Sequence, residues 1–306
     1  MANTFAPNGF AQFQGTGATP SYEQTAMAIA STNTTPIFLN DPIVQASSAS
    51  TGVGTGYIAQ AAAPVSLAVS GIVVTAGVAV ATFTALSAAP PVGATVVFTG
   101  TSFATGGSFN SAYTITASST TTVTFTVNGA FSSTLTFGAA TVYVPVAGVF
   151  TGCKYLSTSQ KRTVWSNYWP GSDANGDVTA YAITDPNAQF VVQTGNSNTT
   201  ATAVGLANVG QNIGFSYSQS GVTTTNGNTA TGISTYFADQ YTLSANSAQG
   251  YYANAVLPFR IVSLLNYVPG QTSPLVSING SDPTTAYNKI VVGFNNAMPN
   301  RPGAGI

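Results

Sequence analysis

Apolar and polar residues alternate in short runs along most of this chain, a pattern with the period of two that β-strands show. The runs are most closely spaced between residues 64 and 146. They predict strands at 65–69, 72–75, 78–84, 94–99, 112–118, 121–127 and 139–144. Turn-forming pairs such as Ala76-Gly77 and Asn128-Gly129 separate them. About seven short strands with turns about every 8–12 residues are typical of an immunoglobulin-like β-sandwich.

The segment from residue 147 to residue 306 carries the same strand pattern, with more charged and aromatic residues. Its predicted strands are 149–156, 178–184, 188–193, 213–217, 231–237, 256–265 and 288–294. Residues 1–63 and 147–306 each look incomplete alone, so we expect one base domain built from both. The 64–146 sandwich is then an insertion in one of its loops. A linear three-part chain is the alternative.

Both ends of the chain look like extended arms. Residues 1 to about 35 hold four spaced aromatic residues, Phe5, Phe10, Phe13 and Tyr22, among Gly and Pro. These side chains need a surface to lie on, in this subunit or in a neighbouring one. One short helix is predicted over Ser21–Ser31, with Ser21 as N-cap. The predicted fold class is therefore all-β: a sandwich- or barrel-like base domain, an inserted immunoglobulin-like β-sandwich, and extended terminal arms.

Charge is scarce, and this changes the functional picture. The 306 residues include six Lys and Arg and seven Asp and Glu, or 4%, against about 25% in ordinary globular proteins. Residues 42–153 hold none of them. A monomer normally needs surface charge to resist association, so we expect this chain to function within an assembly. The formal net charge of -1 gives no basis for nucleic-acid binding.

The uncharged stretch 65–89 is long enough to span a bilayer. Its alternating apolar residues and the absence of flanking Lys or Arg favour strands instead, so no membrane partner is expected. The N-terminus lacks the basic and apolar segments of a signal peptide, and there is a single cysteine. Synthesis in a reducing cytoplasm fits both observations.

The sequence contains few of the residue types that catalyse reactions. There is no histidine, so Ser–His–Asp and Cys–His catalysis are excluded, and Cys153 has no histidine to activate it. Asp41, Asp185 and Asp282 each precede a proline, which is a turn context. We therefore predict no enzyme activity and no cofactor.

One segment resembles a metal-binding loop. Asp173, Asn175 and Asp177 place oxygen atoms at alternate positions, as calcium loops do. Gly176 falls one residue early for an EF-hand, and Thr184 stands where the bidentate Glu is needed. These three residues are a candidate calcium site, and an ordinary polar turn is the alternative reading.

An aromatic cluster follows the basic residues Lys161 and Arg162. Trp165, Tyr168 and Trp169 lie close together in sequence, and Trp, Tyr and Arg are enriched in interface hot spots. If exposed, the cluster is a candidate for binding a partner subunit or a sugar. If buried, it belongs to the core.

The base domain carries a series of short motifs in a fixed order: Val149-Phe150-Thr151-Gly152-Cys153-Lys154-Tyr155, Ser166-Asn167-Tyr168-Trp169-Pro170-Gly171, Val178-Thr179-Ala180-Tyr181-Ala182-Ile183, Asp185-Pro186, Phe190-Val191-Val192-Gln193, Leu257-Pro258-Phe259-Arg260-Ile261-Val262 and Ile290-Val291-Val292-Gly293-Phe294-Asn295-Asn296. In this order they resemble a family of tailed-bacteriophage virion structural proteins, the capsid decoration or cement proteins. The run Phe109-Asn110-Ser111-Ala112-Tyr113-Thr114-Ile115-Thr116 also resembles immunoglobulin-like modules inserted in phage surface proteins, although Ser111 stands where Gly often follows the Asn.

The resemblance implies a subunit that binds the outside of the major capsid protein shell and stabilises it. Its partners would be the major capsid protein and other copies of itself, with a homotrimer as the arrangement suggested by analogy. Its location would be the virion surface after synthesis in the host cytoplasm. The alternative is a phage tail, fibre or receptor-binding protein with a glycan-binding β-domain. In either case the immunoglobulin-like domain is a candidate for contact with host-surface glycan.

Overall fold

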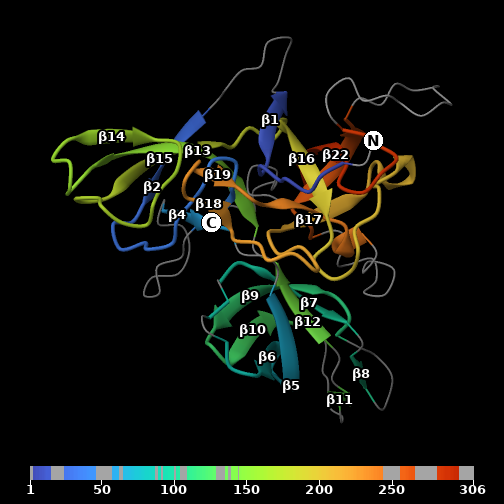
Figure 1. The fold of residues 1–306 in the computed structure, drawn as a ribbon. Helices are drawn as coiled ribbons and strands as arrows, with labels where there is room; N and C mark the ends of the chain where they lie inside the picture. The colour runs from blue at the N-terminus through green and yellow to red at the C-terminus, as the bar shows by residue number, and fades with distance from the viewer. Residues whose placement is uncertain are drawn as a thin grey trace.

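The computed structural model describes residues 3–14, 24–45, 57–61, 65–86, 89–90, 92–99, 101–103, 109–128, 135–136, 139–143, 145–243, 256–265 and 281–295. Strands dominate this part of the chain, and the 3-10 turn η1 (Leu206–Asn208) is a short exception. The all-β prediction is therefore confirmed. Figure 1 shows two regions: a barrel at the bottom, and above it two sheets formed by the rest of the chain.

The first region is a closed antiparallel barrel with the strand order β10-β6-β5-β12-β7-β9. Its strands are β5 (Val65–Thr75), β6 (Val78–Phe83), β7 (Thr95–Thr99), β9 (Ala112–Ser118), β10 (Thr122–Thr126) and β12 (Ala139–Tyr143). Beside it, β8 (Ser102–Phe103) pairs with β11 (Leu135–Thr136). On β10, Val123 and Phe125 are buried between outward threonines, as the alternation predicts.

Barrel closure differs from the immunoglobulin-like sandwich expected here. β5 pairs with β12 through its first residues and with β6 through its last, and the register shifts between Val69 and Gly71. β9 likewise pairs with both β7 and β10. β5 and β9 each bend so that one end pairs within β10-β6 and the other within β12-β7. These two shared strands close the sheet into a ring. Among the described strands the pairings establish a closed barrel, and the immunoglobulin-like assignment stays a prediction.

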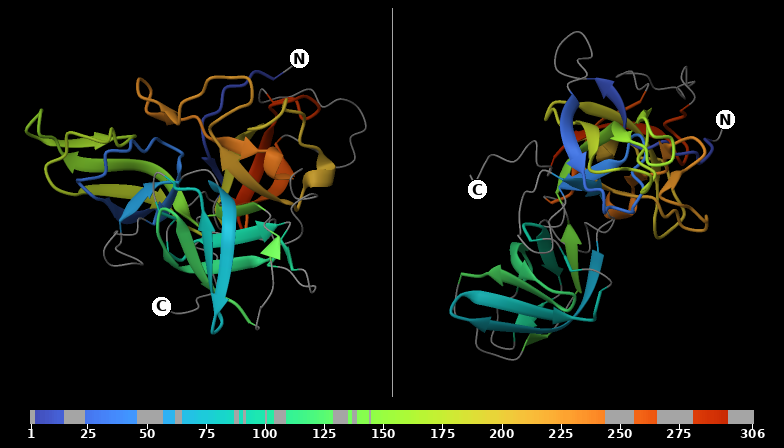
Figure 2. Two further views of the ribbon diagram at one scale, coloured as in Figure 1. Left: turned by 90° about the horizontal axis from the view of Figure 1, so that it is seen from below. Right: turned by 90° about the vertical axis from the view of Figure 1, so that its left-hand side faces the viewer.

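The second region begins with a sheet of order β2-β15-β13-β3-β4, to which β14 adds by pairing with β13. Its strands are β2 (Gln24–Ile29), β3 (Pro42–Gln45), β4 (Ile58–Gln60), β13 (Val146–Leu156), β14 (Thr163–Ser166) and β15 (Val178–Ile183). Strands that precede and follow the barrel in sequence thus lie in one sheet. The outer part of this sheet, formed by β2, β13, β14 and β15, extends away from the rest of the molecule (Figures 1 and 2); we call it the wing.

The helix predicted over Ser21–Ser31 is wrong where the structure describes it. Residues 24–29 form β2, which pairs with β15 over six residues from Val178 to Ile183. An available strand edge outweighs the local helix preference of a short Ala- and Gln-containing segment.

The third sheet has the order β1-β16-β20-β17-β21-β22, and β16 also pairs with β22. Its strands are β1 (Ala11–Gln14), β16 (Gln189–Gly195), β17 (Asn212–Ser216), β20 (Phe237–Asp239), β21 (Phe259–Leu264) and β22 (Lys289–Phe294). The extra pairing joins five of the strands into a ring around the largest core cluster of the protein. A small hairpin of β18 (Gly227–Asn228) and β19 (Ile233–Ser234) lies outside it.

The N-terminal segment belongs to this core, which corrects the expectation that Phe10 is an interface residue. Phe10 is fully buried, and its ring stacks on Phe259 with the centroids 4.2 Å apart. Gly9 makes this entry possible: its φ is 73°, and a Cβ there would lie 2.5 Å from the Asn40 carbonyl oxygen. The described part of the arm is therefore a structural element of the base domain.

The remaining arm residues have different surroundings. Phe5 is half-buried, with its ring against Phe237 and Tyr287 at centroid distances of 5.5 and 5.2 Å. Phe13 on β1 is 41% exposed. Tyr22 and the C-terminal tail lie outside the described residues.

A small apolar cluster joins the barrel to the rest of the chain. Val97 and Tyr143 from the barrel pack with Val256 and Leu257, which precede β21. Burial raises the pKa of Tyr143 to about 12. The barrel lies to one side of the two sheets (Figures 1 and 2).

Candidate functional site

The outer surface of the wing carries an exposed apolar and basic group of side chains, which we call the wing face. It consists of Lys154 and Leu156 on β13, Trp165 on β14 and Tyr181 on β15. Trp165 is 66% exposed and Leu156 is 44% exposed. The sequence Cys153-Lys154-Tyr155-Leu156 alternates between buried and exposed, so every second side chain points outward.

Strand register brings these side chains together. Lys154 lies directly opposite Trp165, and its Nζ is 5.1 Å from the Trp165 ring centroid. The Trp165 and Tyr181 rings are nearly parallel, at 13° and a centroid distance of 5.7 Å. A cation–π contact at an exposed site contributes only about 0.5–1 kcal/mol, so this arrangement leaves Trp165 available to a partner.

Two further cations lie at the turn between β13 and β14. Lys161 and Arg162 are both exposed, and the Arg162 Nε donates a hydrogen bond of 2.9 Å to the Gln160 side chain. The turn closes on itself through the Ser157 amide, which donates to the Arg162 carbonyl at 2.9 Å. Three of the six Lys and Arg residues of the chain therefore lie within residues 154–162.

The other half of the predicted aromatic cluster turns inward. Trp169 is fully buried, so its expected interface role is wrong. Its Nε1 donates to the Asn33 carbonyl oxygen at 3.1 Å, and its ring meets Tyr155 edge to face at 5.4 Å. Tyr168 is half-buried and stacks on Phe38 at 5.7 Å.

The candidate calcium residues are engaged with other parts of the protein. The Asp173 carboxylate accepts hydrogen bonds from the hydroxyls of Ser157, Thr158 and Ser159, at 2.6, 2.7 and 2.9 Å, and from the Ser159 amide at 2.7 Å. These donors, the Ser157 hydroxyl first, lower the pKa of Asp173.

Asp177 serves a different contact. It accepts hydrogen bonds from the Tyr57 hydroxyl at 2.5 Å and the Ser31 amide at 3.0 Å, and the Tyr57 bond is the main reason that its pKa is lowered. The Asn175 amide donates to the Leu156 carbonyl at 2.8 Å. No group of three His, Cys, Asp or Glu side chains suited to a metal occurs in the described ranges. The segment works here as a polar turn that fixes the end of the wing.

Cys153 lies on β13, on the buried face opposite the wing face. Burial raises its thiol pKa to about 12, so the reactive thiolate is not accessible at neutral pH.

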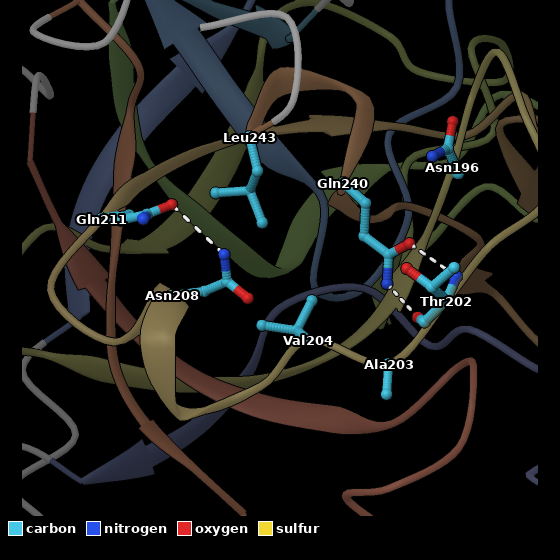
Figure 3. Close-up of a pocket in the computed structure, with 8 residues that line it drawn as sticks. All are labelled: Asn196, Thr202, Ala203, Val204, Asn208, Gln211, Gln240 and Leu243. Carbon is cyan, nitrogen blue, oxygen red and sulfur yellow. Dashed lines mark hydrogen bonds between the residues drawn. The ribbon is translucent and has the colours of Figure 1, made fainter. Parts of the chain in front are cut away.

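A cavity of about 310 Å³ lies beside the third sheet. Figure 3 shows its lining of mostly polar residues: Asn196, Thr202, Ala203, Val204, Asn208, Gln211, Gln240 and Leu243. Its amide groups bond to neighbouring loops. The Thr202 amide donates to the Gln240 side chain at 3.0 Å, and the Asn208 side chain donates to Gln211 at 3.3 Å. The cavity residues thus hold the loops that surround them.

Comparison with known protein families, curated proteins and solved structures found no match. Nor does any helical segment in the described part of the chain combine the length and hydrophobicity needed to cross a bilayer.

Sequence reasoning identified Trp165 and Arg162 on the wing and missed Lys154, Leu156 and Tyr181. Lys154 and Leu156 could have been found from the alternation of residues 153–156, which places both side chains on one face of a strand. Tyr181 joins the site through strand pairing, which one strand's sequence does not reveal.

Proposed function

We propose that this chain is a structural subunit of a tailed-phage particle, which binds the outside of the major capsid protein shell and stabilises it. The observation that carries the proposal is a chain with extensive buried cores and only six basic and seven acidic residues. Such a surface has little charge with which to resist association. A subunit that is permanently covered by neighbours does not need that protection.

The apolar surface supports the same proposal. Large apolar side chains that are at least 40% exposed occur on all parts of the described structure: Phe13, Val73, Val78, Leu156, Trp165, Leu206, Val222 and Val262. Exposed apolar groups gathered in patches mark interaction sites more often than chance. On the wing face, Leu156 and Trp165 form such a patch with Tyr181.

The proposed partners are the major capsid protein and further copies of this chain, with a homotrimer as one arrangement. The proposed location is the virion surface, after synthesis in the host cytoplasm. The role requires no cofactor and no catalysis.

Re-attachment to shells tests the proposal. Purified full-length protein is added to capsid shells that lack it, and binding is measured by co-sedimentation. Shell stability is then measured as the temperature at which packaged DNA is released. We expect saturable binding and a higher release temperature. Binding that never saturates, or leaves the release temperature unchanged, would contradict the proposal.

The alternative is a tail, fibre or receptor-binding protein, and one observation favours it. Trp165 is 66% exposed, with the half-buried Tyr181 ring nearly parallel to it, and an exposed aromatic face is suited to stacking on a sugar ring. The neutral barrel is the other candidate for a glycan contact. Binding of the purified protein to a glycan panel, lost in Trp165→Ala, would support this alternative over the capsid role.

A further inference from the structure

We propose that the wing face docks a carboxylate-bearing segment of a neighbouring particle protein, with Trp165 as the anchor and Lys154, Lys161 and Arg162 as the charge partners. This inference rests on the proposed function, because it names the partner chemistry of the same assembly role. It adds which surface makes the contact and what the contact recognises.

The distribution of charge is the first argument. In a chain with six Lys and Arg residues, three occur between residues 154 and 162, and all three are exposed. The structure records no ion pair for them within its described ranges; Arg162 bonds to Gln160, and Lys154 lies over Trp165. The nearby carboxylates of Asp173 and Asp177 are held by hydroxyl and amide donors instead. The cations are therefore available to carboxylates of another chain.

The anchor is the second argument. Trp165 is 66% exposed, and Leu156, which is 44% exposed, lies on the same side of the sheet. The Tyr181 ring stacks on Trp165 from β15, across the intervening strand β13. An apolar anchor with one cation over its ring and two more at the adjoining turn has the composition of an interface hot spot with a polar rim. The charges then set orientation and partner choice, and burial of the tryptophan supplies most of the affinity.

Position in the fold is the third argument. β14 pairs only with β13 among the described strands, so its outer edge has no strand partner there. Figure 1 shows β14 and β15 at the end of the wing farthest from the barrel. An extended segment can reach this edge without displacing another element, and edge strands accept such segments through main-chain hydrogen bonds.

A protein segment fits better than a nucleic acid. Binding to a phosphate backbone requires many cationic contacts, and the wing face and its adjoining turn together offer three in a chain whose net charge is -1. The apolar area around Trp165 would also remain uncovered on a phosphate backbone.

Shell attachment provides the first test, with the full-length protein and single-surface variants. We expect Trp165→Ala to weaken binding by about 30-fold or more, the loss typical of a hot-spot residue. The triple variant Lys154→Gln, Lys161→Gln, Arg162→Gln should weaken it by about 10-fold and remove the salt dependence of the wild type. Val209→Ala, exposed beside η1, and Arg260→Gln, exposed on β21, are the matched controls and should bind within about 2-fold of wild type.

If the wild type binds shells and both wing variants bind them equally well, the inference is overturned and the proposed function stands. Failure of the wild type to bind shells would count against the proposed function, and a second measurement then decides the inference. In it, a peptide that alternates Glu with Val is compared with one that alternates Lys with Val, by tryptophan fluorescence of the free protein.

Trp165 is the reporter in this assay, because the other tryptophan, Trp169, is fully buried. The acidic peptide should change the emission, and neither the basic peptide nor the Trp165→Ala variant should show the change. Equal responses to the two peptides, or no response to either, would overturn the inference. Displacement of the acidic peptide by short duplex DNA at equal concentration would overturn the choice of a protein partner.

Discussion

Asp41 is buried where several parts of the base domain meet. Its backbone carbonyl accepts the Phe150 amide at 2.9 Å, and its Oδ2 accepts the Phe38 amide at 2.8 Å and the Gln60 side-chain amide. Oδ1 has no hydrogen-bond partner in the described structure, and the Ser234 hydroxyl lies close to the carboxyl group. Burial is the main reason that the pKa of Asp41 rises from 3.8 to about 7.

This pKa predicts how stability changes with pH. Below about pH 4 the carboxyl is protonated in both the folded and the unfolded chain, so it adds no pH dependence. Between the two pKa values the unfolded chain releases the proton and the folded protein keeps it, so stability falls as pH rises. At about 1.4 kcal/mol for each pH unit between 3.8 and about 7, the total loss is roughly 4 kcal/mol and is complete above about pH 7.

Asp41→Asn removes the titration and keeps an oxygen that can accept from Phe38 and Gln60. Its amide nitrogen takes the place of the unpartnered Oδ1. We expect the variant to gain roughly 4 kcal/mol over the wild type between about pH 4 and about pH 8. Urea unfolding across this range, followed by the fluorescence of the buried Trp169, measures the difference.

Asp177→Asn is the matched control, because the pKa of Asp177 is lowered, not raised. The stabilisation that Asp177 contributes is present above its unfolded pKa and is lost as pH falls. The free energy of unfolding of this variant should therefore change with pH in the same way as that of the wild type from about pH 6 to about pH 8. If the free energy of unfolding of Asp41→Asn also follows that of the wild type from about pH 4 to about pH 8, the reasoning about the buried carboxyl is refuted.

Three further predictions concern the core, the cysteine and the polar turn. Phe10→Ala should lower the free energy of unfolding by about 3–5 kcal/mol, because it leaves a cavity against Phe259. Phe13→Ala, at an exposed position, should change it little, and equal effects of the two variants in urea unfolding would contradict the burial of Phe10. Cys153 should react with a chromogenic thiol reagent only after unfolding, since burial raises its pKa to about 12, and rapid reaction of the native protein would show the strand to be open. Millimolar calcium should leave the melting temperature unchanged and Asp173→Ala should lower it; a calcium-dependent rise that this variant abolishes would establish a metal site.

The sequence was sufficient for the all-β class and for many strands, because alternation is a local property. Thr122–Thr126 and residues 153–156 show this well, since their patterns match the buried and exposed sides of β10 and β13. Barrel closure was not predictable in the same way. It depends on β5 and β9 each pairing with two different neighbours, which is a non-local property of the sheet.

The aromatic cluster shows the same limit within the candidate site. Continuous strand alternation would put Trp165 and Trp169 on one face, but β14 ends at Ser166. The chain bends over residues 167–168, and Trp169 re-enters the fold through an isolated bridge to Ile37. One tryptophan therefore faces solvent and the other fills the core. Phe10 was misassigned for a related reason, because its burial depends on Gly9 meeting Asn40, far along the chain.

The number of copies of this chain in a particle tests the central claim most directly. Quantitative mass spectrometry of purified virions gives the ratio of this chain to the major capsid protein. A subunit that covers the shell should be present in hundreds of copies, in a fixed simple ratio to the capsid protein. A few to some dozens of copies would contradict the capsid role and indicate a tail protein, and absence from purified virions would contradict a structural role in the particle.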